Sequence, residues 1–160
     1  MDSRFIGTKC GKRDRLGLMF LRSVIRLLPE NKFLLATEAC SCPDEIGTED
    51  NWKDAEWYSI DIAGDLDHWS IGWTDWNLLL SESGGPAHVK QHCEAPMIFN
   101  TTSRELIVGP KVFALAHFSK FLRPGSKIVK TKNSDSESGI EPLKGGVVSV
   151  SGITQDGKGV

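Results

Sequence analysis

A continuous apolar run that ends in one acidic residue is the feature that most constrains the fold of this chain. Residues 33–37, Phe-Leu-Leu-Ala-Thr, lead directly into Glu38. A short apolar run without polar alternation is typical of a strand covered on both faces, as in a parallel sheet flanked by helices. Reactive groups of such sheets lie where the strands end. Glu38 is therefore a candidate active-site carboxylate, although a helix cap or a loop ion pair is the commoner role for an acid in this place.

Regular patterns on both sides of this run predict the helix and strand units of an α/β fold. Residues 16–28 predict a helix that Pro29 ends, immediately before the strand. Apolar residues then recur at three- and four-residue intervals from Trp52, which predicts a helix ending near His68 and a second strand over residues 70–74. The apolar stripe of that helix consists of Ala55, Tyr58, Ile62, Leu66 and Trp69.

The second half of the chain predicts shorter elements separated by turns. Residues 81–86, which end in Gly-Gly-Pro, have the composition of a turn. Pro110 suits the first position of a helix, and a mostly apolar stretch follows it until Pro124. The predicted elements are a strand at 96–99, a helix at 110–121, a strand at 128–131, a polar linker at 133–139 and a strand at 147–150.

Length, charge and hydropathy exclude several classes of protein. The 160 residues suit one ordinary domain, and the formal net charge of -2 provides no basic stripe for a phosphate backbone, so no nucleic-acid partner is expected. The longest apolar stretch, residues 16–28, is interrupted by Arg22 and Arg26. It is therefore too short to span a membrane and does not match a signal peptide.

The cysteine and histidine residues leave the redox compartment open and do not predict a metal site. Four cysteines are too few and too uneven to define a disulfide scaffold, although any pair could bridge in an oxidising compartment. Cys-x-Cys and His-Cys without a second well-spaced pair do not match a structural zinc site. His68 and His117 are better explained as packing residues with satisfied hydrogen bonds. The possible metal ligands are Cys40, Cys42, His68, His88, His92 and Cys93, and the fourth cysteine is Cys10.

One tripeptide matches the acceptor pattern for N-glycosylation. It is Asn100-Thr101-Thr102. The pattern matters only if the chain enters the secretory pathway, and such tripeptides often arise by chance. Its use is left open by the sequence.

All five tryptophans lie between Trp52 and Trp76, and they are densest just after the predicted second helix. Core strands favour Val, Ile and Leu, whereas Trp, Asp, Trp and Asn at a strand end form a flat apolar wall with polar edges. Such a surface stacks on a sugar ring and binds its hydroxyl groups. The alternative is a tryptophan-rich layer that packs a helix on the sheet, with Asp75 as a cap. The residue types alone favour neither interpretation.

Several motifs occur in the order found in one known family. They are ATEAC at 36–40, GWTDWNL at 72–78, GGP at 84–86, and HFSKF at 117–121 followed by PGS at 124–126. Together they resemble the carboxyl-terminal part of the lysosomal glucosylceramidases, the acid beta-glucosidases of glycoside hydrolase family 30. The resemblance covers roughly residues 26–128. Residues 1–25 and the tail after Lys130 follow the family pattern poorly.

The resemblance implies a fold, an activity and site residues. The family has a (β/α)8 TIM barrel with an attached β-sandwich, and it hydrolyses the β-glucosidic bond of glucosylceramide with retention of configuration, without a cofactor. Glu38 matches its nucleophile, and Trp76 matches a tryptophan that lines the glucose site. Gln91 occupies the place after Gly-Gly-Pro where the family commonly has a sugar-binding asparagine. The substrate-binding residues implied in this way are Trp76, Asp75, Trp73, Cys40 and Gln91.

The same resemblance implies partners and a location. The substrate is the glycolipid glucosylceramide, and the expected partners are a saposin-type activator and an anionic membrane surface. The full-length family member is expected in the lysosome.

A retaining glycosidase needs a second carboxylate about 5 to 5.5 Å from the nucleophile. The family carries this acid/base in an Asn-Glu-Pro-like motif, which does not occur in this sequence. A complete barrel takes about 250 residues. The chain is therefore expected to be an incomplete barrel: a divergent lead-in at 1–25, the carboxyl-terminal part of the barrel at 26–126, and partial β-sandwich strands with a flexible tail at 127–160. A catalytically silent sugar-binding remnant, or a truncated product without function, would share every retained residue.

Overall fold

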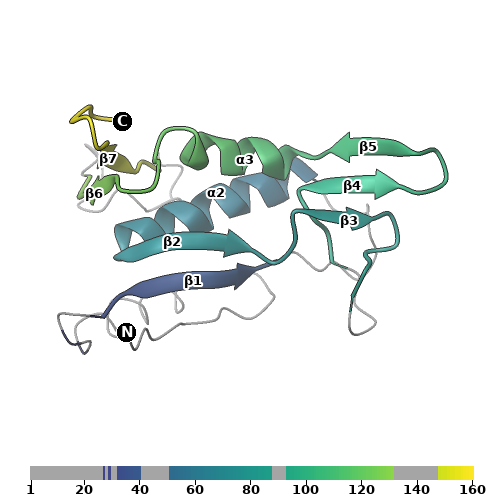
Figure 1. Cartoon of the computed structure of the whole chain (residues 1–160), viewed down its shortest axis with the longest axis horizontal. Helices are drawn as coiled ribbons and strands as arrows, with labels where there is room; N and C mark the ends of the chain where they lie inside the picture. Colours follow the sequence, from purple (N-terminus) through teal and green to yellow (C-terminus); the bar gives the residue numbers. More distant parts are fainter. Residues whose placement is uncertain (1–26, 28, 30–31, 41–50, 88–92, 132–147) are drawn as a thin grey trace.

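The computed structural model describes residues 27, 29, 32–40, 51–87, 93–131 and 148–160, and its elements are shown in Figure 1. The predicted linker at 133–139 lies outside the described residues, and so does the predicted helix at 16–28 except for Leu27, which is helical. The elements are β1 (Leu34–Ala39), α2 (Asn51–Asp67), β2 (Ser70–Asp75), β3 (Leu79–Ser81), β4 (Met97–Asn100), β5 (Glu105–Val108), α3 (Pro110–Ser119), β6 (Lys127–Val129) and β7 (Ser151–Ile153).

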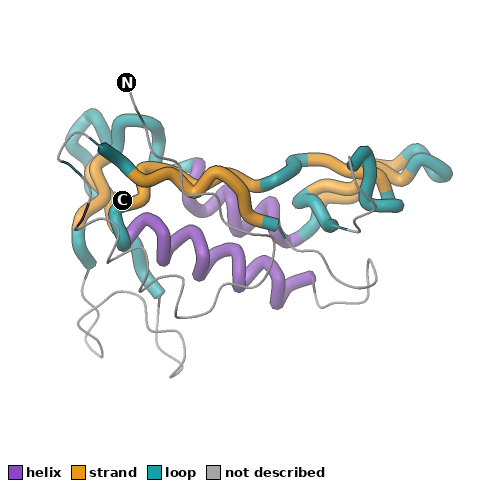
Figure 2. The backbone as a smooth tube through the Cα atoms, turned by 90° about the horizontal axis from the view of Figure 1, so that it is seen from below, coloured by secondary structure: helices purple, strands orange, loops and turns teal. Residues whose placement is uncertain are grey.

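The parallel pair β1 and β2, joined through α2, confirms the predicted α/β unit. Leu34 pairs with Ser70 at one end of the two strands, and Ala39 pairs with Asp75 at the other. β1 extends further than predicted, so that Glu38 lies within the strand rather than after it. Figure 2 shows the helices on one side of the strands. Both strands therefore present their carboxyl ends at the same edge of the sheet.

The core lies between this sheet and the two helices. α2 and α3 pack on each other, and Ala55, Tyr58 and Ala114 form a buried cluster against which Trp73 packs. Three members of the predicted stripe of α2 are buried, as expected from its period. Trp69 is not, because its backbone φ of 70° turns the chain out of the helix and leaves the side chain 67% exposed.

A second sheet with the order β3-β4-β5 follows β2 in the chain. β3 pairs with β4 in parallel, and β4 pairs with β5 as an antiparallel hairpin. β4 confirms the strand predicted at 96–99, but β3 and β5 were not predicted. The turn predicted at 81–86 is present, and Gly84 adopts a φ of 78° in it. α3 begins at Pro110, as predicted.

The last two strands form a separate antiparallel ribbon. β6 pairs with β7 through Ile128 and Gly152. The strand predicted at 147–150 is wrong in position, because residues 148–150 carry no strand pairing and β7 begins at Ser151. Within the described ranges, no helix is long and apolar enough to cross a membrane.

Candidate active site

The carboxyl ends of β1 and β2 bring together the residues that the sequence singled out. The backbone N–H of Trp76 donates to the carbonyl oxygen of Ala39 across 2.8 Å, one residue beyond the last pair of the ladder. Glu38 precedes Ala39 and is half-buried. Glu38, Asp75 and Trp76 therefore lie at neighbouring strand ends, where parallel sheets present their chemistry. Their roles toward a substrate stay predictions.

Asp75 is held by two hydrogen bonds to a single carboxylate oxygen. Its Oδ1 accepts from the Tyr58 hydroxyl at 3.1 Å and from the backbone N–H of Trp76 at 2.9 Å. Its Oδ2 is buried and accepts no hydrogen bond in the described part of the chain. Burial raises the pKa of Asp75 to about 6, while the two hydrogen bonds and the positive charge of Lys111 oppose that rise. Asp75 can therefore change protonation state in mildly acidic solution.

Tyr58 connects α2 to this strand end. Its ring meets the ring of Trp73 edge-on, with centroids 5.4 Å apart, and its hydroxyl reaches Asp75. Burial is the largest cause that raises the pKa of Tyr58 far above its usual value, and the negative charge of Asp75 adds to it. The raised pKa keeps the Tyr58 hydroxyl protonated at neutral pH, so that it can donate to Asp75.

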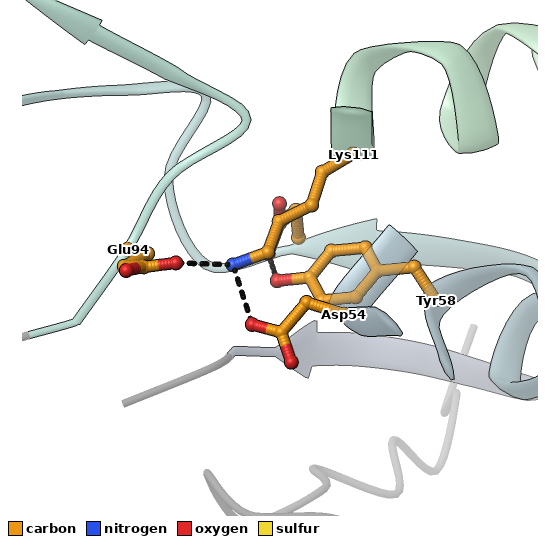
Figure 3. A network of polar contacts seen from close by, with 5 residues as sticks. Asp54, Tyr58, Glu94 and Lys111 are labelled. Atoms are coloured by element: carbon orange, nitrogen blue, oxygen red, sulfur yellow. Dashed lines mark hydrogen bonds and ion pairs between the residues drawn. The ribbon is translucent and has the colours of Figure 1, made fainter. Parts of the chain in front are cut away.

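Lys111 occupies the centre of a buried ion cluster, which Figure 3 shows from close by. Its Nζ lies 3.4 Å from Asp54 Oδ2 and 3.3 Å from Glu94 Oε2, and 5.2 Å from the centre of the Tyr58 ring. Lys111, Asp54 and Glu94 are 3%, 4% and 7% exposed, so these charges are removed from water. The cluster joins α3, α2 and the segment before β4, and it contacts the tyrosine that supports Asp75.

The side chain of Trp73 contacts the helix layer. Its indole Nε1–H donates to Asp61 Oδ2 on α2 at 2.8 Å, and its ring packs on the cluster around Tyr58. These contacts favour the packing interpretation for Trp73. No contact of this kind is described for the side chain of Trp76, which is half-buried at the strand end.

Two further predicted site residues differ in what the structure describes of them. Cys40 directly follows β1 and is disulfide-bonded, as is Cys93. The sulfur beside the proposed nucleophile is therefore not a free thiol. Gln91 lies outside the described residues, so its predicted contact with a sugar stays a prediction.

Two of the four histidines, His68 and His117, lie in the described part of the chain, whereas the candidate ligands His88, His92 and Cys42 lie outside it. Nδ1 of His68 lies 2.7 Å from the carbonyl oxygen of Gly64, and Nδ1 of His117 lies 2.7 Å from that of Phe113. His68 is buried as expected, whereas His117 is exposed. Among the described residues, no group of three or more His, Cys, Asp or Glu side chains is arranged to hold a metal ion.

Tyr58 and Lys111, which support Asp75, were not predicted as site residues from the sequence. Tyr58 was predicted only as an apolar stripe residue, and Lys111 was not distinguished within its helix. The signal that could have found Lys111 is its position on the apolar part of α3, where an unpaired charge would be costly. Its partners Asp54 and Glu94 lie in two distant segments, so no local pattern joins them.

Comparisons with known proteins show which family this chain resembles. The sequence profile described as the glycosyl hydrolase family 30 TIM-barrel domain matches residues 19–122. A Caenorhabditis elegans protein named "Putative glucosylceramidase 3" is 45% identical over 105 residues, which cover 63% of this chain and 20% of that protein. The lysosomal acid glucosylceramidase of Mus musculus is 34% identical over 119 residues, which cover 69% of this chain and 22% of that protein.

A solved structure supports the same relationship. The crystal structure of SrfJ from Salmonella typhimurium matches with a TM-score of 0.73 and 27% identity, over 89% of this chain and 29% of that one. The chain spans about a fifth of the length of the curated relatives named above. The profile covers more than half of the chain, including both strands of the candidate site. The chain therefore belongs to glycosyl hydrolase family 30, and its residues 19–122 match the TIM-barrel domain of that family.

Proposed function

We propose that this chain is the nucleophile-bearing part of a retaining β-glucosidase, with Glu38 as the nucleophile. The observation that carries the proposal is the pairing of strand ends: Trp76 N–H bonds to Ala39 O, which puts Glu38 on the strand end beside Asp75 and Trp76. A carboxylate next to a half-buried aromatic residue suits attack on a sugar held against that residue.

The chemistry needs a second carboxyl group from outside this sequence. Glu38 would attack the anomeric carbon while the second group protonates the departing glycosidic oxygen, which breaks the glycosidic bond and leaves a glycosyl ester on Glu38. The second group, now a carboxylate, would then remove a proton from water as the water oxygen attacks the same carbon and releases Glu38. We use "full-length form" for this segment joined to the remainder of a family 30 barrel.

Asp75 acts in this scheme as a support rather than as the acid/base. Its Oδ1 is occupied by Tyr58 and by the backbone of Trp76, and its Oδ2 is buried. Those contacts fix the position of the Trp76 backbone, and hence the wall on which a glucose ring would stack. The proposed division of roles is therefore Glu38 for the covalent step, Trp76 for the sugar and Asp75 for the position of Trp76.

Glucosylceramide is the substrate that we propose for the full-length form. The support is the set of relatives named as glucosylceramidases, one of them lysosomal. Disulfide bonds at Cys40 and Cys93 fit a protein that matures in an oxidising compartment, as a lysosomal enzyme does. A saposin-type activator and an anionic membrane surface are proposed as partners. Both should increase hydrolysis of glucosylceramide in vesicles but not hydrolysis of a soluble β-glucoside.

Covalent labelling tests the proposed nucleophile. The full-length form is treated with a 2-fluoroglucoside that traps the glycosyl ester, digested and analysed by mass spectrometry. We expect the label on the peptide that contains Glu38, and Glu38→Gln should abolish it. A label on Asp75, or labelling that persists in Glu38→Gln, contradicts the proposal.

The alternative function is a catalytically silent sugar-binding remnant. It is favoured by the lack of an Asn-Glu-Pro-like motif in this sequence. Sequencing of the transcript upstream of Met1 separates the two functions. An in-frame segment with that motif supports the enzyme, and its absence supports the remnant.

A further inference from the structure

Asn100 lies at the end of β4, where the chain turns into β5. Figure 1 shows this hairpin at one end of the molecule, with β6 and β7 at the opposite end. The turn residues Thr101, Thr102, Ser103 and Arg104 are all exposed. Asn100-Thr101-Thr102 is also the only Asn-Xaa-Ser/Thr tripeptide in the 160 residues. A group attached here would therefore extend into solvent without displacing the core.

The hydrogen bonds of the turn leave the amide nitrogen of Asn100 available. Its Oδ1 accepts from the backbone N–H groups of Thr102 and Ser103, each at 2.9 Å. No hydrogen bond from its Nδ2, and none from the hydroxyl of Thr102, is made to the described residues. These are the two side-chain groups that define the acceptor tripeptide. The site therefore presents both defining groups unengaged.

The middle residue of the tripeptide is engaged elsewhere. Thr101 donates from its backbone N–H and from its hydroxyl to the two carboxylate oxygens of Glu82, at 3.0 and 2.5 Å. The side chain of Thr101 is thus turned to the segment after β3, and the turn is anchored without using Asn100 Nδ2. This difference between adjacent threonines provides a matched pair of variants.

The disulfides supply an independent observation about the compartment. Cys40 and Cys93 are both disulfide-bonded, and among the described residues no cysteine is free. Structural disulfides form in the secretory pathway, and N-glycosylation takes place in the same pathway. The chain therefore combines a half-buried acceptor asparagine at the start of an exposed turn with the chemistry of the compartment that uses such an acceptor.

We propose that Asn100 is an N-glycosylation site. The donor would be an oligosaccharide linked through a diphosphate to a polyprenyl lipid. Asn100 Nδ2 forms a bond to the anomeric carbon of the first sugar, the bond from that carbon to the diphosphate oxygen breaks, and the amide loses one proton. The lipid diphosphate leaves, and no oxidant or reductant is needed.

The experiment uses the whole 160-residue chain translated with eukaryotic microsomes behind a cleavable secretion signal. A reporter tripeptide, Asn-Gly-Thr, is appended after Val160 to verify entry into the lumen. Gel mobility before and after peptide N-glycosidase counts the glycans, and peptide mass spectrometry locates the deamidation that the enzyme leaves at a glycosylated asparagine. We expect two glycans, one on Asn100 and one on the reporter.

Four variants make the assignment specific. Asn100→Gln and Thr102→Ala should each lose one glycan and keep the reporter glycan. Thr102→Ser should keep both, because it preserves the hydroxyl. Thr101→Ala should also keep both, since it removes the contact to Glu82 but preserves the acceptor pattern. A glycosylated reporter with unmodified Asn100 in the parent chain, or two glycans on Asn100→Gln, overturns the proposal.

Discussion

The hydroxyl of Tyr58 on α2 donates to Oδ1 of Asp75 at the end of β2, across 3.1 Å. This contact joins the helix layer to the strand end that carries the candidate site. It also connects the buried cluster around Lys111 to the backbone of Trp76, because Lys111 lies over the Tyr58 ring and Trp76 N–H binds the same Asp75 oxygen. The geometry beside Glu38 therefore depends on residues that do not themselves reach the site.

Removal of the Tyr58 hydroxyl should weaken this connection. Tyr58→Phe keeps the ring and its edge contact with Trp73 but removes a hydrogen bond to a largely buried carboxylate. We expect the free energy of unfolding of the full-length form to fall by about 1.5 to 3 kcal/mol. Urea titration measures it. Ser59→Ala, which removes a hydroxyl bound to the backbone of Ala55 on the same helix, is the control and should change stability by less than about 0.5 kcal/mol.

The pH dependence of stability should report the raised pKa of Asp75. A carboxyl whose pKa rises from 3.8 to about 6 on folding binds its proton more tightly in the native state. Its contribution to stability is therefore complete below about pH 4 and is lost as the pH rises through 6. This contribution to the free energy of unfolding is at most about 3 kcal/mol. Asp75→Asn should flatten this part of the profile measured by urea titration between pH 4 and 7.5, and an unchanged slope contradicts the assignment.

Loss of the buried lysine charge should destabilise the fold strongly. Lys111→Met leaves the carboxylates of Asp54 and Glu94 buried without their shared cation, and we expect a loss of about 3 to 5 kcal/mol. Lys120→Met, at the exposed end of the same helix, should cost less than about 0.5 kcal/mol. Adding Asp54→Asn and Glu94→Gln to Lys111→Met should recover most of the loss. If the triple variant is no more stable than Lys111→Met, the electrostatic explanation is wrong.

Trp76 should matter more for hydrolysis than for stability. Trp76→Ala removes the proposed wall of the glucose site. Because Trp76 is half-buried, we expect the free energy of unfolding to fall by about half of the roughly 3 to 5 kcal/mol typical of a fully buried aromatic residue. We expect kcat/KM of the full-length form toward a soluble β-glucoside to fall by at least about 10-fold. Trp69→Ala is a matched control because Trp69 is 67% exposed. Equal activity of the two variants would mean that Trp76 faces elsewhere.

The 160-residue chain alone should neither hydrolyse glucosylceramide nor form a stable monomer. Glu38 without an acid/base partner has no group to protonate the leaving oxygen or to activate water. If the chain is the incomplete barrel predicted from its sequence, two adjacent strands without their barrel neighbours would also leave unpaired backbone edges and uncovered apolar surface, which favour association. Size-exclusion chromatography and a fluorogenic β-glucoside test both statements. A sharp monomer peak with turnover that Glu38→Gln abolishes would require an acid/base within this chain.

The elements predicted correctly from the sequence are those in which the spacing of apolar residues follows from burial. β1, α2, β2 and α3 follow from apolar runs and three- to four-residue spacing, since each buries one face against the others. β5 was missed because all four of its residues are exposed, so that hairpin pairing rather than a buried face defines it. Trp69 was assigned to the stripe of α2 because spacing alone cannot reveal a left-handed backbone at the next turn.

The candidate site was predictable only from local sequence features and from the family resemblance. Glu38 was singled out at the end of an apolar run, Asp75 in the tryptophan-rich segment and Trp76 by the resemblance, and the parallel register brings them to one edge. The support behind them was not predictable, because Asp54, Glu94 and Lys111 come from three segments that tertiary packing alone brings together. Pairing over such separations carries no periodic signal in a single sequence.

The ion cluster around Lys111 also limits how this sequence can diverge. One cation lies between Asp54 and Glu94, so a neutral substitution at position 111 leaves two buried acids beside each other. Substitutions at these three positions should therefore occur together, because a protein with only one of them substituted would have low stability. In related chains the three positions should co-vary, either keeping all the charges or replacing them together by apolar residues of similar volume.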